Sequence, residues 1–478
     1  MPRTKIVCTI GPSSSSPGIL EQLIKAGMNV ARLNFSHGTR PEHGKVIMHI
    51  RKISNRLGRP VAILQDLAGP KIRIGEIENG VVTLNSGELF TLTNRRVLGD
   101  KKVVTINYPG LLKEIKPGDT LLLSDGALEL KVVETNTQDI KCRVIVGGPL
   151  SSNKGINLPT GSIKTPILTG KDKDDLAFGI EHEVDFVALS FVRNAKDVED
   201  VRRFMKRQKG SGIPIIAKIE KHEALRNIDE IIKLVDGIMV ARGDLGVEIP
   251  LEKVPRVQKM LIEKTNKFAK PVITATQMLR SMVDSRRPTR AEVTDVANAI
   301  LDGTDALMLS EETAIGNYPV ESVRMMAKIA EDTESGFPFD TWSQKYSAQN
   351  LKSVQESVSR RACDLAEDIG ARLIITFTQS GSTARMVSKH RPRPVILAAT
   401  PVKETYRRLA LVWGVIPILS KTMKSTDQMI AAVIKEALNS GLVSHGEKIV
   451  ITAGIPLGIS GNTNLIKAEV LESKGIQS

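Results

Sequence analysis

Short apolar runs alternate with longer amphipathic stretches through most of the first 340 residues. The runs are rich in β-branched residues, and the stretches between them place apolar residues at helical spacing, as at 17–26, 41–57 and 171–183. This alternation predicts parallel strands joined by helices. Eight runs occur, at 5–10, 29–33, 60–64, 184–191, 213–219, 237–241, 271–275 and 305–309. Eight such units predict an α/β fold of the (β/α)8 TIM-barrel type.

The pattern changes for about a hundred residues after the third run. Alternating residues there predict short strands at 80–84, 87–93, 102–106, 119–123, 128–134 and 140–146. Asn85-Ser86-Gly87 and Ser124-Asp125-Gly126 are typical of the turns between such strands. We therefore predict an all-β barrel domain at 70–165, inserted after the third barrel strand. Its place above the barrel mouth, with hinges at Gly69-Pro70 and Thr165-Pro166, predicts a mobile lid.

A third unit follows at 341–478. Apolar runs at 372–376, 394–398, 415–419 and 448–452 are separated by helical stretches such as 354–369 and 427–438. This pattern predicts a compact C-terminal α/β domain. The (β/α)8 barrel is then left with 1–69 and 166–340.

Composition narrows the functional classes. No apolar run reaches the roughly 18 residues that a membrane span needs. Cys8, Cys142 and Cys363 are distant in sequence and lack metal-site spacing, which favours a reducing cytoplasm and buried apolar roles. The net charge of +14 attracts polyanions, but aromatic residues make up only 3% and offer little base stacking. Small phosphorylated molecules are the more natural partners, and neither nucleic acid nor membrane is expected.

Polar residues follow several of the predicted barrel strands. The active sites of such barrels lie at the carboxyl ends of the strands, so we expect these side chains in the barrel mouth. They are Arg32, Asn34, Ser36, Asp66, Lys218, Glu220, Arg242, Asp244, Thr276 and Ser310. No serine or cysteine nucleophile with a base, zinc site or Walker loop accompanies them.

The charges in this set indicate phosphoryl or enolate chemistry. Lys218 and Glu220 are two apart on a strand and face the same side. Glu220 and Asp244 suit Mg²⁺, which takes one or two carboxylates and leaves room for substrate oxygens. Lys218 could stabilise a developing oxyanion, Arg32 could bind a phosphate, and the amides near Gly243 could hold a carboxylate. The alternative is a set of structural ion pairs, which six polar strand ends together disfavour.

These residues belong to segments that resemble the pyruvate kinase family over almost the whole chain. No single segment would be specific, but together they are. They are Lys5-Ile-Val-Cys-Thr-Ile-Gly-Pro12, Ala26-Gly-Met-Asn-Val-Ala-Arg-Leu-Asn-Phe-Ser-His-Gly38, Ala217-Lys-Ile-Glu220, Val240-Ala-Arg-Gly-Asp-Leu-Gly-Val-Glu248, Ala275-Thr-Gln-Met278, Pro288-Thr-Arg-Ala-Glu292 and Asp295-Val-Ala-Asn298.

The resemblance implies transfer of a phosphoryl group from phosphoenolpyruvate to ADP, giving pyruvate and ATP in the last step of glycolysis. It implies Mg²⁺ or Mn²⁺ on Glu220 and Asp244, charge stabilisation by Lys218 and a phosphate contact from Arg32. It assigns the substrate carboxylate to Gly243, Asp244 and Thr276. Proton delivery to the enolate is assigned to the region of Thr276 and Ser310.

Further expectations concern the nucleotide and the assembly. The resemblance assigns nucleotide contacts to Arg73 and Lys154, alongside Asn34, Phe35, Ser36 and His37. It also implies a cytoplasmic homotetramer whose C-terminal domain serves effector binding and assembly.

One stretch departs from the family pattern. Many pyruvate kinases that need K⁺ have Asp-Thr-Lys-Gly-Pro-Glu where this chain has Asp66-Leu-Ala-Gly-Pro-Lys71. Asn34, Ser36 and Asp66 keep the rest of the cation pocket, while Leu67 lacks the threonine hydroxyl and Lys71 reverses the charge. We therefore expect the Lys71 ammonium to replace K⁺, which would be dispensable. The alternative is that Lys71 points into solvent.

The C-terminal domain contains a candidate phosphate cradle for a phosphorylated effector. It comprises Thr378, Ser380, Gly381, Ser382 and Thr383, between a strand and a helix, and the loop at 453–462 could close over it. An ordinary capped helix is the alternative.

Two other functional classes stay open. A lyase or aldolase could use the same Mg²⁺-enolate chemistry without a nucleotide, and a non-catalytic binding protein could use the same fold.

Overall fold

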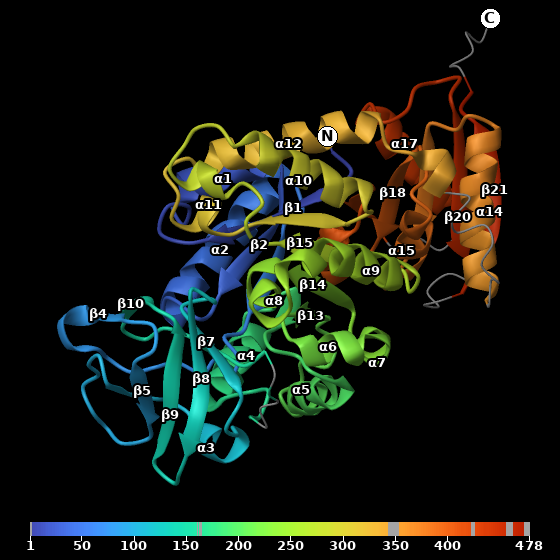
Figure 1. Ribbon diagram of the computed structural model, residues 1–478. Helices are drawn as coiled ribbons and strands as arrows, with labels where there is room; N and C mark the ends of the chain where they lie inside the picture. Colours follow the sequence, from blue (N-terminus) through green and yellow to red (C-terminus); the bar gives the residue numbers. More distant parts are fainter. Residues whose placement is uncertain are drawn as a thin grey trace, which may run out of the picture. The chain divides into compact units, whose positions relative to one another are not determined.

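The computed structural model describes residues 2–159, 161, 165–342, 353–421, 426–455 and 462–472. Eight parallel strands form the predicted closed barrel, in the order β1-β16-β15-β14-β13-β12-β3-β2 (Figure 1). The strands are β1 (Lys5–Ile10), β2 (Met28–Asn34), β3 (Ala62–Asp66), β12 (Phe186–Leu189), β13 (Ile215–Ile219), β14 (Gly237–Ala241), β15 (Val272–Ala275) and β16 (Ala306–Leu309).

Most strands of this barrel are short and fully buried, which is why they read as continuous apolar runs. The helices between them are α1 (Pro17–Ala26), α2 (Arg40–Leu57), α4 (Gly170–Glu181), α5 (Ala195–Arg207), α6 (His222–Arg226), α7 (Ile228–Leu234), α8 (Arg242–Glu248), α9 (Val254–Asn266), α10 (Arg290–Leu301), α11 (Glu311–Ala314) and α12 (Pro319–Ser335). Short 3-10 turns lie at η2 (Leu251–Lys253) and η3 (Arg280–Val283).

Local chemistry sets the helix ends. Ser16 caps α1, with Pro17 in its first turn, and Gly27 ends it at φ 126°. Thr39 and Glu42 form a reciprocal capping box at the start of α2. One helix of the barrel was not predicted: α8 begins directly after β14, so the segment around Gly243 is helical and not a loop.

Contacts divide the chain into two compact units. The first comprises Met1–Gln65, His182–Val187 and Ile262–Ser478, and the second comprises Asp66–Glu181 and Ala188–Leu261. The division passes through β3 and β12. The three-domain division expected from the sequence stays a proposal.

The inserted segment, within the second unit, is built mainly from antiparallel strands. Six strands form a sheet in the order β11-β7-β8-β9-β5-β6, and β10 pairs with β4. The bounds are η1 (Glu78–Gly80), β4 (Val81–Leu84), β5 (Leu89–Thr93), β6 (Val103–Thr105), α3 (Leu111–Glu114), β7 (Thr120–Leu123), β8 (Leu128–Thr135), β9 (Asp139–Val146), β10 (Gly148–Ser151) and β11 (Ile156–Asn157). The predicted turn at 124–126 joins β7 to β8 and has positive φ at all three residues.

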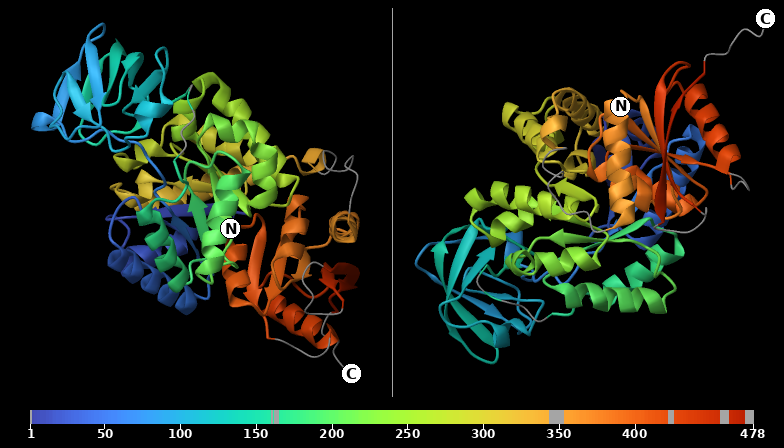
Figure 2. Two further views of the ribbon diagram at one scale, coloured as in Figure 1. Left: turned by 90° about the horizontal axis from the view of Figure 1, so that it is seen from below. Right: turned by 90° about the vertical axis from the view of Figure 1, so that its right-hand side faces the viewer.

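The C-terminal part, within the first unit, has a five-stranded sheet in the order β19-β18-β17-β20-β21 (Figure 2). Its helices α14 and α15 pack on one face and α17 on the other. The antiparallel edge strand β21 was not predicted. The bounds are α14 (Val354–Asp368), β17 (Leu373–Phe377), α15 (Ser382–Lys389), β18 (Val395–Thr400), α16 (Lys403–Arg408), η4 (Leu409–Leu411), β19 (Val415–Leu419), α17 (Thr426–Asn439), β20 (Lys448–Gly454) and β21 (Thr463–Val470).

Two expectations from composition can be compared with this fold. All three cysteines are free and buried, as expected. None of the described helices is both long and apolar enough to cross a membrane.

An aspartate directly precedes three of the barrel strands and makes the same contacts each time. Asp185 precedes β12, Asp236 precedes β14 and Asp305 precedes β16. One oxygen of each carboxylate accepts a backbone N–H from the neighbouring strand at 2.8–2.9 Å, and the donors are Ile63, Ile215 and Val272 respectively. An arginine pairs with each carboxylate. These arginines are Arg51 and Arg407 for Asp185, Arg202 for Asp236, and Arg391 for Asp305.

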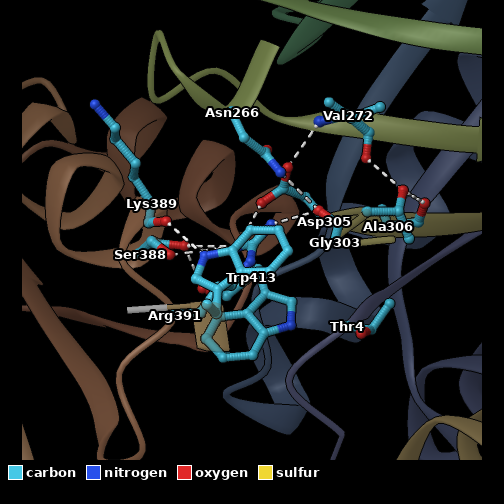
Figure 3. Close-up of polar contacts among 12 residues, drawn as sticks. Thr4, Asn266, Val272, Gly303, Asp305, Ala306, Ser388, Lys389, Arg391 and Trp413 are labelled. Carbon is cyan, nitrogen blue, oxygen red and sulfur yellow. Dashed lines mark hydrogen bonds and ion pairs between the residues drawn. The ribbon is translucent and has the colours of Figure 1, made fainter. Parts of the chain in front are cut away.

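Arg391 joins the C-terminal part to the barrel through the third of these carboxylates (Figure 3). Its guanidinium donates to Asp305 Oδ1 at 2.9 Å and to Gly303 O at 2.8 Å. The side chains of Arg391 and Asp305 are 1% and 7% exposed, and the guanidinium lies over the Trp413 ring, 4.6 Å from its centroid. A buried charge with several partners of this kind is costly to leave unpaired.

We predict that Arg391→Met destabilises the protein by about 3–5 kcal/mol, because it leaves the Asp305 carboxylate buried without its cation. Arg202→Met is the matched control, since it breaks the same contact where the two side chains are 36% and 43% exposed. That loss should stay below about 1 kcal/mol. Urea unfolding followed by far-ultraviolet circular dichroism measures both losses, because that signal reports on the helices and strands of both units. Equal losses in the two variants would contradict the prediction.

Candidate functional site

Lys218, at the end of β13, is the centre of a charged cluster in the second unit. Its ammonium lies 2.8 Å from Glu220 Oε1 and 3.4 Å from Asp66 Oδ1, and it donates to Ser190 Oγ at 2.7 Å. Lys218 and Glu220 therefore share one side of the strand, as the alternation predicted. The hydroxyl of Ser190 donates in turn to Leu67 O at 2.8 Å. We call Asp66, Ser190, Lys218 and Glu220 the lysine cluster.

Close backbone packing holds this cluster in place. Gly69 has φ 68°, and a methyl group there would lie 2.9 Å from Phe191 Cδ2 and 3.0 Å from Ser190 Cβ. Phe191 itself has φ 59°, and its N–H donates to Glu220 Oε2 at 2.8 Å. Both oxygens of Glu220 are thus fixed, one by Lys218 and one by a strained backbone.

The charge of Asp244 is close enough to affect the ionisation of Glu220. Burial raises the pKa of Glu220, the Lys218 ammonium lowers it, and the charge of Asp244 raises it again. Two carboxylates that repel each other, one of them 1% exposed, form a pair that a divalent cation would relieve. Within the described residues there is no group of three or more acidic, histidine or cysteine side chains around a common point. A two-carboxylate arrangement still fits Mg²⁺, which commonly takes its other ligands from water and substrate.

The helix that carries Asp244 is tied to the inserted segment. Glu248, at the end of α8, is buried and contacts Lys221 Nζ at 2.5 Å and His222 Nδ1 at 3.1 Å. The Asn157 amide, in β11, donates to the same carboxylate at 3.3 Å. Burial raises the pKa of Glu248, but these partners outweigh it and leave the pKa below its usual value.

Arg32 lies in the first unit, on β2. Its guanidinium donates to Thr9 Oγ1 at 2.9 Å, and that hydroxyl donates to Leu309 O at 3.0 Å. Thr313 Oγ1 donates to Thr9 O at 2.9 Å. Hydrogen bonds thus link the carboxyl ends of β1, β2 and β16 around the arginine.

Thr276 and Ser310 belong to the same unit and are organised by a carboxylate that sequence reasoning missed. Thr276 follows β15 at φ 67°, an unfavourable conformation for a β-branched residue. Glu312 accepts the N–H of Leu279 at 3.0 Å and that of Ser310 at 2.7 Å. Burial raises its pKa above the usual value, although these hydrogen bonds lower it. The Ser310 hydroxyl is buried without a hydrogen-bond partner among the described atoms, so it is available to a ligand.

The expected nucleotide residues fall into two groups. Arg73 and Lys154 lie on adjacent segments of the inserted part, where Ile74 N donates to Lys154 O at 2.9 Å and Arg73 donates to Asn153 O at 3.1 Å. The second group follows β2 and comprises Asn34, Phe35, Ser36 and His37. Asn34 Oδ1 accepts the N–H of Ser36 at 3.1 Å, and the Phe35 ring is buried in a stack on His43 with centroids 4.2 Å apart. Phe35 can therefore contact a nucleotide only through its backbone.

Lys71 is half buried, not simply solvated. Its side chain passes Gly155, where a methyl group would lie 2.8 Å from Lys71 Cε. Leu67, in place of the family's threonine, is buried at 2% exposure. The replacement of K⁺ by Lys71 stays a prediction.

The candidate effector cradle surrounds the start of α15. Gly381 precedes the helix at φ 81°, Ser380 O accepts from Arg385, and the Thr383 hydroxyl is hydrogen-bonded to Thr463 Oγ1 at 2.7 Å. Thr378 is buried and pairs through its backbone with Ala399. Residues 456–461 of the loop expected to cover this cradle lie outside the described residues.

Comparison with known proteins identifies the family of the chain. A family model described as "Pyruvate kinase, barrel domain" matches residues 1–323, and one described as "Pyruvate kinase, alpha/beta domain" matches residues 356–468. The chain belongs to the pyruvate kinase family. It is 46% identical over 473 residues to "Pyruvate kinase" of Clostridium acetobutylicum, covering 99% of this chain and 100% of that protein.

Two further relatives are longer than this chain. "Pyruvate kinase 2" of a Synechocystis species is 49% identical over 475 residues, covering 98% of this chain and 80% of the relative. "Pyruvate kinase" of Geobacillus stearothermophilus is 47% identical over 471 residues, with coverages of 98% and 80%. Family membership makes the chain a phosphotransferase.

We predict that Glu312→Ala lowers kcat for pyruvate formation about 10- to 100-fold. The carboxylate holds two backbone N–H groups beside Thr276 and Ser310, and hydrogen bonds to charged groups contribute about 1.5–3 kcal/mol. Glu311→Ala is the control, because the Glu311 carboxylate is 51% exposed and pairs with Arg280, whose side chain is 50% exposed. Steady-state kinetics on folded samples would contradict the prediction if both variants kept wild-type turnover.

Proposed function

We propose that the chain catalyses the reaction for which its family is named, transferring the phosphoryl group of phosphoenolpyruvate to ADP. Phosphoenolpyruvate, ADP and a proton give pyruvate and ATP, the last step of glycolysis. The observation that carries the proposal is the lysine cluster, in which one ammonium, on a side chain that is 12% exposed, lies against two buried carboxylates and a hydroxyl. Such a preorganised charge stabilises a transferring phosphoryl group without a covalent intermediate.

The chain's own side chains have separate tasks in this proposal. Lys218 stabilises the charge of the transferring group, and it can exchange its contacts with Asp66 and Glu220 for substrate oxygens. Arg32 binds the substrate phosphate, held in orientation by its hydrogen bond to Thr9. The Gly243 amide, in the first turn of α8, receives the substrate carboxylate together with Thr276.

Mg²⁺ or Mn²⁺ is the cation that Glu220 and Asp244 would hold. When bound, it neutralises charge on the substrate's oxygens. The raised pKa of Glu220 supports this assignment, because a carboxylate that is costly to ionise alone gains most from a nearby cation.

Proton delivery to the enolate is assigned to the side of Thr276 and Ser310. The buried Ser310 hydroxyl without a hydrogen-bond partner supports this role, since it can hold a water or donate directly. ADP is assigned to Arg73 and Lys154 of the inserted segment, with Asn34 and the backbone of 35–37. This segment would act as the lid.

A coupled assay of pyruvate formation from phosphoenolpyruvate and ADP tests the proposal. We expect turnover that requires Mg²⁺ or Mn²⁺, disappears with a chelator, and falls about 100- to 1,000-fold in Lys218→Met. Lys171→Met is a control at a lysine that is 55% exposed. Pyruvate formation that proceeds without ADP would instead indicate transfer of the phosphoryl group to water, and absence of pyruvate with both metals would reject catalysis.

We further propose that the enzyme does not need K⁺. The side chain of Leu67 offers no oxygen ligand. Lys71 brings a permanent positive charge to a position where K⁺-dependent members of the family have glutamate. Its half-buried stem beside Gly155 favours a defined position over a solvated one.

Activity in sodium and in potassium buffers should differ less than about twofold, because the ammonium supplies the cation's charge. Lys71→Glu should create a K⁺ requirement, whereas Lys102→Glu, the same charge reversal at an exposed site of the inserted segment, should not. A wild-type enzyme with a large loss of kcat in sodium would overturn the idea.

Three further proposals rest on the resemblance to the family and not on contacts in the structure. They are a homotetramer, a cytoplasmic location and a phosphorylated effector in the cradle at 378–383. The buried free cysteines are compatible with a reducing compartment.

A further inference from the structure

A cavity of about 500 Å³ lies at the amino ends of three strands in the C-terminal sheet. Its cationic residues come from four separate segments of the first unit. Arg3 precedes β1, Arg372 precedes β17, Arg393 precedes β18, and Lys448 begins β20. We call this the basic cavity. It is distinct from the cradle at 378–383, which follows the carboxyl end of β17.

Two of the four cations are already engaged. Arg3 donates to the carbonyl oxygens of Pro392 and Arg393 and lies over the Phe339 ring. Arg393 pairs with Glu367 at 2.9 Å and with Asp340 at 2.7 Å. These contacts hold both side chains in place on one side of the cavity. Burial and the neighbouring charge of Arg393 lower the pKa of Arg3.

Arg372 and Lys448 are different. They lie side by side on adjacent parallel strands, where Arg372 N donates to Lys448 O at 2.8 Å. Both side chains are exposed, and within the described part of the chain neither has an ion-pair partner. The register pairs Leu373 with Ile449, so the two cations project from the same face of the sheet.

Charge and shape together indicate the ligand class. Four cations line the cavity against the two carboxylates of Glu367 and Glu447. Glu367 is paired with Arg393, and Glu447 accepts the N–H of Ser444 at 2.7 Å. The remaining lining is apolar or glycine, namely Ala366, Gly370, Ala371, Pro394, Val395 and Gly446. A volume in this range suits a small metabolite.

We propose that the basic cavity binds a phosphorylated small molecule, with its phosphate on Arg372 and Lys448. An arginine presents two parallel donors to phosphate and a lysine adds a point charge. The apolar lining and the bare backbone of Gly370 and Gly446 receive the rest of the molecule. This site is additional to the catalytic centre and to the cradle.

Site-resolved acetylation of the full-length wild-type chain tests the proposal. Lys448 is exposed and should react readily with an acylating reagent, and peptide mass spectrometry gives its rate. We expect adenosine 5′-monophosphate to slow the labelling of Lys448 at least about threefold. Adenosine should have no effect, because it lacks the phosphate. Lys435 on α17 is the exposed internal control and should not change. Unchanged labelling of Lys448 at about 10 mM of both the nucleotide and inorganic phosphate overturns the proposal.

Calorimetry on variants locates the binding. Arg372→Ala with Lys448→Ala should weaken adenosine 5′-monophosphate binding at least about tenfold. The control, Lys403→Ala with Lys435→Ala, removes the same charge from exposed positions elsewhere in the C-terminal part and should leave affinity unchanged. Ser382→Ala in the cradle should leave the Lys448 protection intact. The assignment would be overturned if Ser382→Ala abolished the protection of Lys448 from labelling. It would also be overturned if Arg372→Glu left that protection unchanged.

Discussion

The aspartates that precede β12, β14 and β16 fix the amino ends of the barrel. Each carboxylate accepts a backbone N–H at a neighbouring strand and holds an arginine, so one residue sets strand register and anchors an outer element. Two of these arginines, Arg391 and Arg407, come from the C-terminal part. These structural charges therefore lie at the amino ends, whereas the lysine cluster and Arg32 lie at or after the carboxyl ends of their strands. This separation is the general plan of (β/α)8 enzymes.

The lysine cluster has the opposite character. At the amino ends every buried charge has a lasting partner, whereas Lys218 shares its contacts with groups that a substrate or cation can replace. Glu220 is held by a strained Phe191 and lies near a second carboxylate, and both features are costly in the isolated protein. On the proposed assignment, a divalent ion would relieve the repulsion and a phosphate would receive the ammonium.

The sequence predicted the barrel well, since each buried strand is a continuous apolar run between helical stretches. It also predicted that Lys218 and Glu220 face the same side, because alternation along a strand is purely local. The sequence did not predict features that depend on contacts between residues distant in the chain. Ser190 and Phe191 could have been found by reading the end of β12 as the other strand ends were read, but Glu312 acts on Leu279, a distant residue. The edge strand β21 was missed because TNLIKAEV is largely polar and half exposed, so only its pairing with β20 defines it.

Helix α8 was missed because two glycines lower its intrinsic propensity, yet this short helix connects two functions. Asp244 lies in its first turn, and Glu248 at its last residue is held by Asn157 of the inserted segment. On the neighbouring strand β7, the turn at 124–126 approaches the same helix, since a methyl group at Gly126 would lie 3.6 Å from Val247 Cγ1. On the proposed assignments, a displacement of the inserted segment on nucleotide entry would shift the helix that carries Asp244. Nucleotide entry would then change the affinity for the divalent cation, so the order in which the two ligands arrive would not be random.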